Sequence, residues 1–381
     1  MNISNSILAG GIIGFAFLVT LGFFLSDIEL EYSEPAAEVV QVDFEAGEYM
    51  ELYCNPEIDK NRDRVPDNLD VEGPIDWSYC NLSDVNLSNR DFSGANLQGS
   101  NLWQADLSNT DLSGANLSYS NLYKTILVNT TLNYTNLSYA NLCNLHGGFL
   151  RFPGTDLSHA DFDHAVFLWA DFSDAIVKYT NFHDANLTLA NFSDKDLTGA
   201  NLSNTVLTGA NLSNAVLTGA NLTGSNLTNA NLTDADLLAI DLTGANLTGV
   251  DLSGMDLTGT ILRGADQSGM NLTGTILTEA DLSNSILTGA DLSNAILINA
   301  NLSNATLENT NLLDANLDSA NLTSADLRNA LLAGANLSNA ILTDSDLTNA
   351  VLTGAILTGA NLENAVLTNV ILNCVGHPLC V

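Results

Sequence analysis

Residues 196–230 read DLTGA NLSNT VLTGA NLSNA VLTGA NLTGS NLTNA, a run of five-residue blocks that share one pattern. In each block a central Leu is followed by Ser or Thr, then by Gly or Asn, and then by a small residue. Outward from this stretch the same frame runs from Asp76 to Val375, and only Gly147 and Gln267 clearly break it at the apolar position. A period of five fits neither a helix nor a strand alone. We therefore expect short extended pieces joined by turns, since Thr-Gly and Ser-Asn favour turns.

The phenylalanines indicate how many blocks complete one coil. Phe152, Phe172 and Phe192 recur at every fourth block, and so do Phe162 and Phe182. Four blocks per coil would stack each set as a ladder, with successive coils about 4.8 Å apart, as neighbouring strands are. The repeat would then form about 15 coils and a rod of roughly 70 Å.

The motif A(D/N)Lxx, seen in Ala95-Asn96-Leu97 and Ala280-Asp281-Leu282, resembles the pentapeptide repeat family over residues 76–375. This resemblance implies an all-β fold, a right-handed quadrilateral parallel β-helix whose central Leu or Phe and small residues point inward. It also suggests a function, because some pentapeptide repeat proteins resemble duplex DNA in charge and width and bind DNA gyrase.

The composition restricts the partners. The chain has 381 residues with 44 acidic and 10 basic side chains, a formal net charge of −34. Direct binding to nucleic-acid phosphates is disfavoured at this charge, because such partners require Lys and Arg. Only 7% of the residues are aromatic, which favours a narrow core of Leu and Ala.

The N-terminal part is organised differently. After a short tail over residues 1–6, the segment Ile7–Leu25 carries no charge and has the length of one transmembrane helix. A cleaved secretion signal is the alternative, although no small-x-small cleavage site lies near Phe24. Acidic residues follow the apolar segment, so the positive-inside rule predicts that the body of the chain lies outside the cytoplasm. Residues 26–58 are expected to form an acidic linker.

Residues 59–70 place oxygen-bearing side chains at alternating positions, and residues 59–75 are assigned to a calcium-like loop. Hard cations such as Ca²⁺ take six to eight oxygen ligands. The segment resembles the thrombospondin type 3 calcium repeats, although Arg64 replaces the expected Gly at the sharp turn. A solvated acidic linker is the alternative. The resemblance implies the ligands Asp59, Asn61, Asp63, Asp67 and Asp70, with Val65 giving a carbonyl oxygen.

The five cysteines suggest two disulfides if the body lies outside the cytoplasm. Proximity favours the pairs Cys54–Cys80, at the start of the repeat, and Cys374–Cys380, which would close residues 376–381 as a C-terminal cap. Four cysteines allow three connectivities, so the pairing rests on proximity alone. In a cytoplasmic protein all five would be thiols.

The least regular stretch, residues 141–195, contains a candidate metal site. Stacking of blocks four apart aligns Cys143, Asp163 and His183 in one column, and His164 with Asp184 in the next. Such a set could hold zinc or a similar ion. The alternative is a group of cross-strand ion pairs on a solvated surface.

Three functions compete. The first is a membrane-tethered, extracytoplasmic spacer or protein-binding scaffold without catalysis, with the membrane and an unidentified protein as partners. The second is a DNA-mimicking regulator of DNA gyrase, and the third a metal-binding surface module. An enzyme is not expected, because a smooth rod offers no cleft that excludes water. Calcium is the one cofactor that the sequence suggests.

Overall fold

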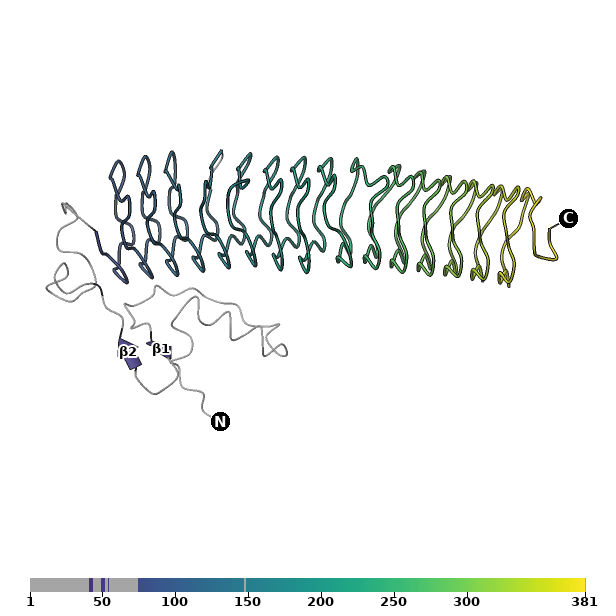
Figure 1. The fold of residues 1–381 in the computed structure, drawn as a ribbon, viewed down its shortest axis with the longest axis horizontal. Helices are drawn as coiled ribbons and strands as arrows, with labels where there is room; N and C mark the ends of the chain where they lie inside the picture. Colours follow the sequence, from purple (N-terminus) through teal and green to yellow (C-terminus); the bar gives the residue numbers. More distant parts are fainter. Residues whose placement is uncertain (1–40, 44–48, 52–53, 55–74, 147–148, 381) are drawn as a thin grey trace. The chain divides into compact units, whose positions relative to one another are not determined.

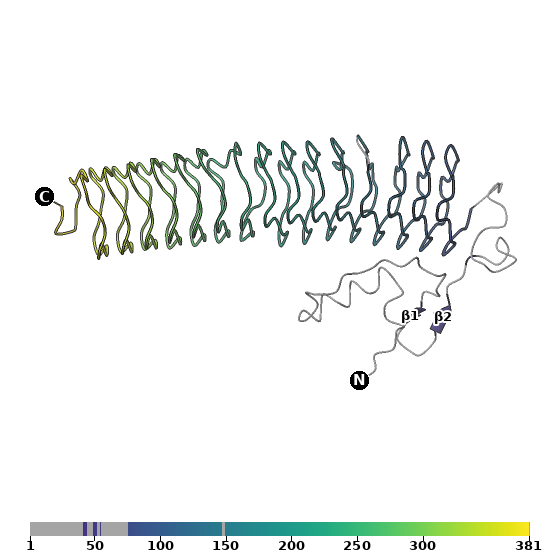
Figure 2. The same cartoon turned by 180° about the vertical axis from the view of Figure 1, so that it is seen from behind.

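The computed structural model describes residues 41–43, 49–51, 54, 75–146 and 149–380. These residues fall into two compact units. The first unit extends to His146 and includes Gly154–Asp161, and the second contains residues 149–153 and everything from Phe162. Each unit consists of coils that follow one another along the chain (Figures 1 and 2).

Two named strands precede the coils. β1 (Gln41–Asp43) and β2 (Tyr49–Glu51) pair antiparallel, with Val42 opposite Met50. They lie within the segment for which the sequence predicts a linker. No helix among the described residues has the length and apolar character of a membrane span. The predicted span Ile7–Leu25 and the calcium-like loop 59–75 lie outside the described residues, except for Ile75.

The coil repeats every four blocks, which confirms the predicted four-block coil and the β-solenoid. The first residue of a block forms a parallel bridge with the first residue of the block four further on, as Asp281 does with Asn301. Two backbone bonds make this bridge. The Leu282 N–H donates to the Asn301 carbonyl at 2.7 Å, and the Asn301 N–H donates to the Ala280 carbonyl at 2.9 Å.

A tight turn forms the corner of each block. In one corner the Ala295 N–H donates to the Leu292 carbonyl at 3.1 Å, and Asn294 between them has a φ of +58°. Positive φ favours Gly and Asn over other residues. This explains why the sequence places Gly or Asn at this position so often.

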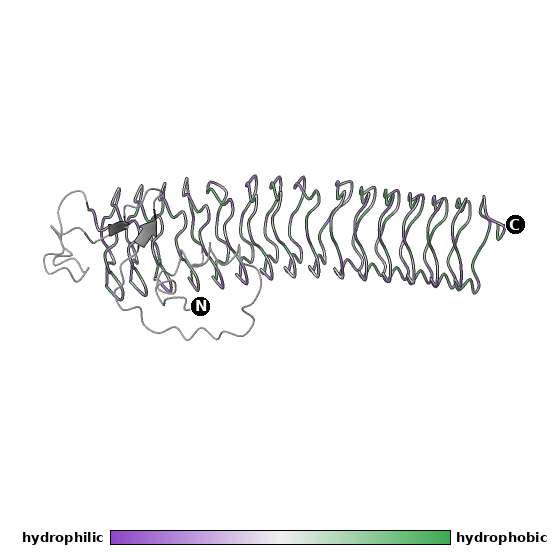
Figure 3. Ribbon diagram, turned by 90° about the horizontal axis from the view of Figure 1, so that it is seen from below, coloured by the Kyte–Doolittle hydropathy of each residue, from purple (hydrophilic) through white to green (hydrophobic). Residues whose placement is uncertain are grey.

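The central Leu and the small residue of each block fill the interior, and polar residues alternate with them around the coil (Figure 3). In the second unit Phe172 stacks on Phe152 at 4.8 Å and on Phe192 at 4.5 Å. Phe182 stacks on Phe162 at 5.3 Å. Both predicted phenylalanine ladders are therefore confirmed.

Hydrogen-bonded side chains also repeat from coil to coil on the outer surface. The Asn321 amide donates to Asn301 Oδ1 at 3.1 Å, and the Ser303 backbone N–H donates to the same oxygen at 3.2 Å. These bonds explain the preference for Asn and Asp at the first position of a block. Their side chains bond both to the next coil and to their own turn.

The ladder is interrupted beside Met255 in the second unit. In this described part of the chain, no bridge joins Asn231 to Asp251 or Asp236 to Asp256. A cavity of about 440 Å³ opens there, although the sequence predicts a surface without a cleft. Met255 stands where most blocks have a small residue, so its side chain needs more room between the coils. Repulsion between nearby carboxylates has the same effect. The lining includes Asp234, Asp236, Leu238, Asp251, Met255 and Asp256.

The frame also changes at the C-terminal end, where the sequence predicts an unbroken repeat up to Val375. Ile356 forms its bridge with Val375 rather than with Gly376, so the last block is one residue short. The Cys374–Cys380 disulfide closes the segment that follows. Leu362, Leu367 and Leu372 of the last coil are only half-buried, whereas the leucines one coil earlier are fully buried.

Candidate functional site

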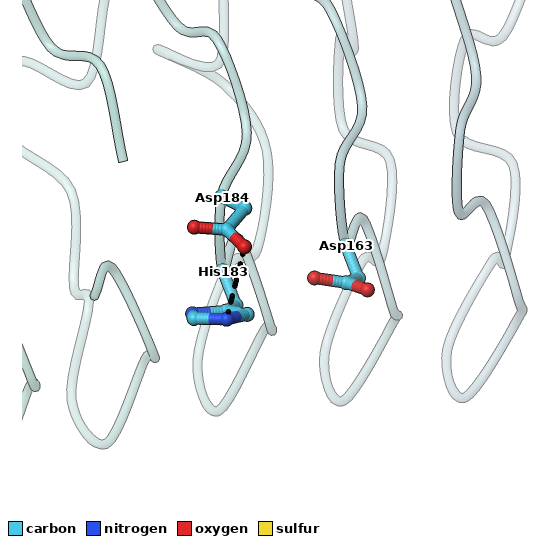
Figure 4. Close-up of side chains that lie close together, drawn as sticks. All are labelled: Asp163, His183 and Asp184. Carbon is cyan, nitrogen blue, oxygen red and sulfur yellow. Dashed lines mark ion pairs between the residues drawn. The ribbon is translucent and has the colours of Figure 1, made fainter. Parts of the chain in front are cut away.

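The candidate metal site lies in the second unit, on two neighbouring coils. Asp163 and His183 occupy the third position of their blocks, and His164 and Asp184 occupy the fourth. The backbone holds the coils in register, since the His164 N–H donates to the His183 carbonyl at 3.0 Å. Figure 4 shows His183 and Asp184 on one coil and Asp163 on the coil beside it.

The polar atoms of these side chains converge. His183 Nε2 lies 3.2 Å from Asp184 Oδ2. The His164 ring lies between the two carboxylates, with Nε2 3.6 Å from Asp163 Oδ2 and Nδ1 3.7 Å from Asp184 Oδ2. One ligand atom from each of Asp163, His183 and Asp184 can be chosen so that all three lie within 4.8 Å of one another.

A serine on the following coil orients His183. His183 Nδ1 lies 2.8 Å from Ser203 Oγ and 3.1 Å from the Ser203 carbonyl oxygen. The Ser203 hydroxyl donates its own hydrogen to Asn201 Oδ1 at 2.7 Å. Ser203 is absent from the site predicted from the sequence, although its place one coil after His183 could have indicated it.

All four side chains are accessible to solvent. The exposed fraction is 54% for His164 and between 31% and 36% for Asp163, Asp184 and His183. An ion could therefore reach the group without any movement of the backbone. Two carboxylates and two imidazoles offer oxygen and nitrogen ligands, whereas nothing here resembles a nucleophile with its general base.

The remaining predicted site residues are placed as follows. Cys143 belongs to the first unit, where its backbone N–H donates to Asn141 Oδ1, and it takes part in neither disulfide. The disulfides join Cys54 to Cys80 and Cys374 to Cys380. The calcium ligands implied by the resemblance (Asp59, Asn61, Asp63, Val65, Asp67 and Asp70) lie outside the described residues.

A second notable surface is formed by aromatic side chains at the turn corners of the first unit. Tyr119, Tyr139 and His159 stack in sequence at 4.8 and 4.5 Å, with their rings nearly parallel. Partial burial raises the pKa of Tyr119, and the nearby phenol of Tyr139 adds to this effect. Tyr134 stands at another corner and is 74% exposed.

The second unit has its own aromatic corners. Phe149 and Trp169 stack at 5.1 Å with their rings 4° from parallel, and both are exposed. Tyr179 lies against Gly199 and Leu189 against Gly209, so each side chain extends along the surface toward the next coil. All four residues have positive φ, between +57° and +60°.

The comparisons with solved structures return repeat proteins of the same kind. HetL of the cyanobacterium Nostoc, involved in heterocyst differentiation regulation, is 27% identical over 74% of this chain and 92% of its own, with a TM-score of 0.24. Rfr23 of the cyanobacterium Cyanothece is 47% identical over 24% of this chain and 64% of its own (TM-score 0.24). Trypsin-treated QnrB1, a plasmid-mediated fluoroquinolone resistance protein, is 26% identical over 46% and 88% (TM-score 0.28).

No curated protein matches the chain. The family model described as pentapeptide repeats (8 copies) matches residues 80–144, 150–178 and 196–369 in overlapping stretches. These stretches cover most of the coils in both units, and they carry the same five-residue frame that sets the backbone bridges. The chain therefore belongs to the pentapeptide repeat family.

Proposed function

We propose that this protein is a membrane-tethered scaffold that binds another protein outside the cytoplasm and has no chemistry of its own. The observation that carries the proposal is the set of exposed aromatic side chains at the turn corners of both units. The anchor is the uncharged segment Ile7–Leu25, and the partner is a protein to be identified by experiment.

The corner aromatics are not required by the fold. A bulky residue at positive φ costs on the order of 1 kcal/mol relative to Gly. Corners elsewhere in the chain use Asn or Gly, for example Asn294 and Gly244. Aromatic residues nevertheless stand at a series of exposed or half-buried corners: Tyr79, Tyr119, Tyr134, Tyr139, Phe149, Trp169 and Tyr179. Aromatic side chains are enriched in the contact surfaces of protein complexes, which favours a protein partner.

The disulfides support a location outside the cytoplasm. Cys54–Cys80 and Cys374–Cys380 close the two ends of the repeat, and such bonds persist mainly in oxidising compartments. This agrees with the orientation that the acidic residues after Leu25 predict.

A DNA-mimicking regulator of DNA gyrase is the second candidate, and the charge density weighs against it. Beyond Asp76 the chain has 28 acidic and 7 basic residues, a net of −21. Over about 15 coils this is about 1.4 charges per coil, whereas duplex DNA carries roughly 2.8 in the same 4.8 Å. An exposed aromatic surface is also unlike a phosphate backbone.

Topology can be tested by cysteine labelling of intact cells with a membrane-impermeant maleimide, before and after reduction. We expect labelling at Cys143 alone before reduction and at all five cysteines after it. Protection of the whole chain until the cells are lysed, with five reactive thiols, would refute the extracytoplasmic placement. Inhibition of gyrase supercoiling by the purified protein would favour the second candidate.

Partner binding can be tested by photocrosslinking in native membranes, with a benzophenone amino acid at Tyr134. We expect a discrete adduct that is lost in the variant Tyr119→Asn/Tyr139→Asn, because Asn suits the corner and keeps the coil. The matched control, Asn309→Gly/Asn329→Gly, changes two corners of the second unit and should leave the adduct unchanged. An adduct that persists equally in both variants would refute the role of the corner aromatics.

A further inference from the structure

We propose that Asp163, His183 and Asp184, with His164 beside them, bind a divalent transition metal ion such as Zn²⁺ between two neighbouring coils. This site goes beyond the scaffold function and does not depend on it. The argument begins with the hydrogen atoms of His183.

The contacts of His183 determine which ring nitrogen carries hydrogen. A carbonyl oxygen can only accept, so the 3.1 Å contact with the Ser203 carbonyl requires hydrogen on Nδ1. The Ser203 hydroxyl gives its hydrogen to Asn201 Oδ1, so it accepts from Nδ1 as well. Both contacts therefore assign the hydrogen to Nδ1.

In the neutral ring this leaves Nε2 with a lone pair that faces a carboxylate. Nε2 lies 3.2 Å from Asp184 Oδ2, so two acceptors stand opposite each other. Such a contact is repulsive unless a positive charge lies between the atoms. The charge can be a second proton on the ring or a metal ion, and both would use the same lone pair.

The neighbouring side chains favour a metal ion over a proton alone. Asp163 comes from the adjacent coil, and its carboxylate belongs to the same cluster of possible ligand atoms within 4.8 Å. In a tetrahedral zinc site the ligand atoms lie about 3.4 Å apart, so modest side-chain rotations would close the group around an ion. His164, which lies between the two carboxylates, can supply a further nitrogen.

The ligand types select the class of metal. Imidazole nitrogens with carboxylate oxygens suit zinc, copper or nickel, whereas calcium and magnesium prefer oxygen alone. The contact of His183 Nδ1 with Ser203 also resembles the outer hydrogen bonds of metal-binding histidines, which orient the ring and raise its basicity. Because Asp163 lies on one coil and His183 with Asp184 on the next, a bound ion would join these two coils.

Isothermal titration of the oxidised full-length protein with Zn²⁺ tests the site, in excess Ca²⁺ to occupy oxygen-only sites. We expect one ion per chain, with affinity reduced at least about ten-fold in His183→Ala and about ten-fold in Ser203→Ala. His159→Ala is the matched control, since His159 is a corner histidine of the first unit, and it should bind as the wild type does. Cys143→Ser should also bind normally, because the proposed ligands exclude the thiol.

A second readout keeps the test valid if a variant is less stable. The ¹⁵N resonance of His183 Nε2 should shift when Zn²⁺ is added to the wild-type protein, while Nδ1 remains protonated. Far-UV circular dichroism should show that each variant keeps the coil. Absence of zinc binding by the wild type, or equal binding by His183→Ala, would overturn the proposal and leave a protonated ion pair in its place.

Discussion

The substitution Gln267→Leu should stabilise the protein, because it removes a polar side chain from the interior. Gln267 occupies the central position where other blocks have an apolar residue, and it is fully buried. Neither Nε2 nor Oε1 of its side chain has a hydrogen-bond partner among the described residues. Its backbone is normal, since its N–H donates to the Ile286 carbonyl at 2.8 Å. The defect is therefore confined to the side chain.

The size of the gain follows from the two buried polar atoms. Each unsatisfied buried group costs about 1–3 kcal/mol, so we expect the free energy of unfolding to rise by about 2–4 kcal/mol. Leu fits the position, because Leu247 and Leu287 occupy the same place in the coils on either side and are fully buried.

Urea unfolding monitored by circular dichroism would measure this gain as a higher midpoint. Hydrogen exchange should slow at the amides around Gln267, which separates a local gain from a global one. The control Gln104→Leu makes the same change at an exposed corner and should alter stability by less than about 0.5 kcal/mol. The reverse substitution Leu287→Gln should lower the midpoint. An unchanged or lower midpoint for Gln267→Leu would refute the reasoning.

Three further predictions concern an ion pair, a corner and a disulfide. Arg328 binds both carboxylate oxygens of Asp326, at 2.8 and 2.7 Å, and holds the pKa of Asp326 below its ordinary value. The pair therefore stabilises the fold above the pKa of the unfolded Asp, and this is lost as pH falls through the folded pKa. In Arg328→Met the pKa of Asp326 should rise in a carboxyl NMR titration. Gly244 has a φ of +68°, and there is open space where the methyl group of an alanine would stand. The strain alone should therefore make Gly244→Ala cost about 1 kcal/mol in urea unfolding, and Gly244→Asn less. Cys54→Ser/Cys80→Ser removes a link across a sequence separation of 26. It should destabilise the first coils by about 3 kcal/mol, measured by hydrogen exchange at Trp77.

The repeat could be read almost entirely from the sequence. The period of five and the spacing of Phe152, Phe172 and Phe192 define the four-block coil, because one residue type recurs wherever the interior needs it. The columns that contain Asp163, His183 and Asp184 follow from the same period. The directions of their side chains do not, since rotamers depend on neighbours such as Ser203 that the repeat pattern treats as ordinary.

Three departures from regularity were harder to predict. Met255 at a small-residue position was visible in the sequence, but the opening of the ladder beside it also depends on how the surrounding carboxylates repel one another. The short last block gave no signal, because Ile371 and Leu372 still fit the frame and the shift occurs only at Val375. The hairpin of β1 and β2 was not predicted, since both strands are very short.

The regular spacing of the bridges also determines how this protein can change length. Removal of one residue inside a unit would displace every downstream side chain from its vertical neighbour, whereas excision of a whole revolution, such as residues 281–300, would rejoin equivalent positions. The molecule thus behaves like a graduated ruler whose smallest division is about 4.8 Å. Gene duplication could lengthen it in the same increments without redesigning a single contact.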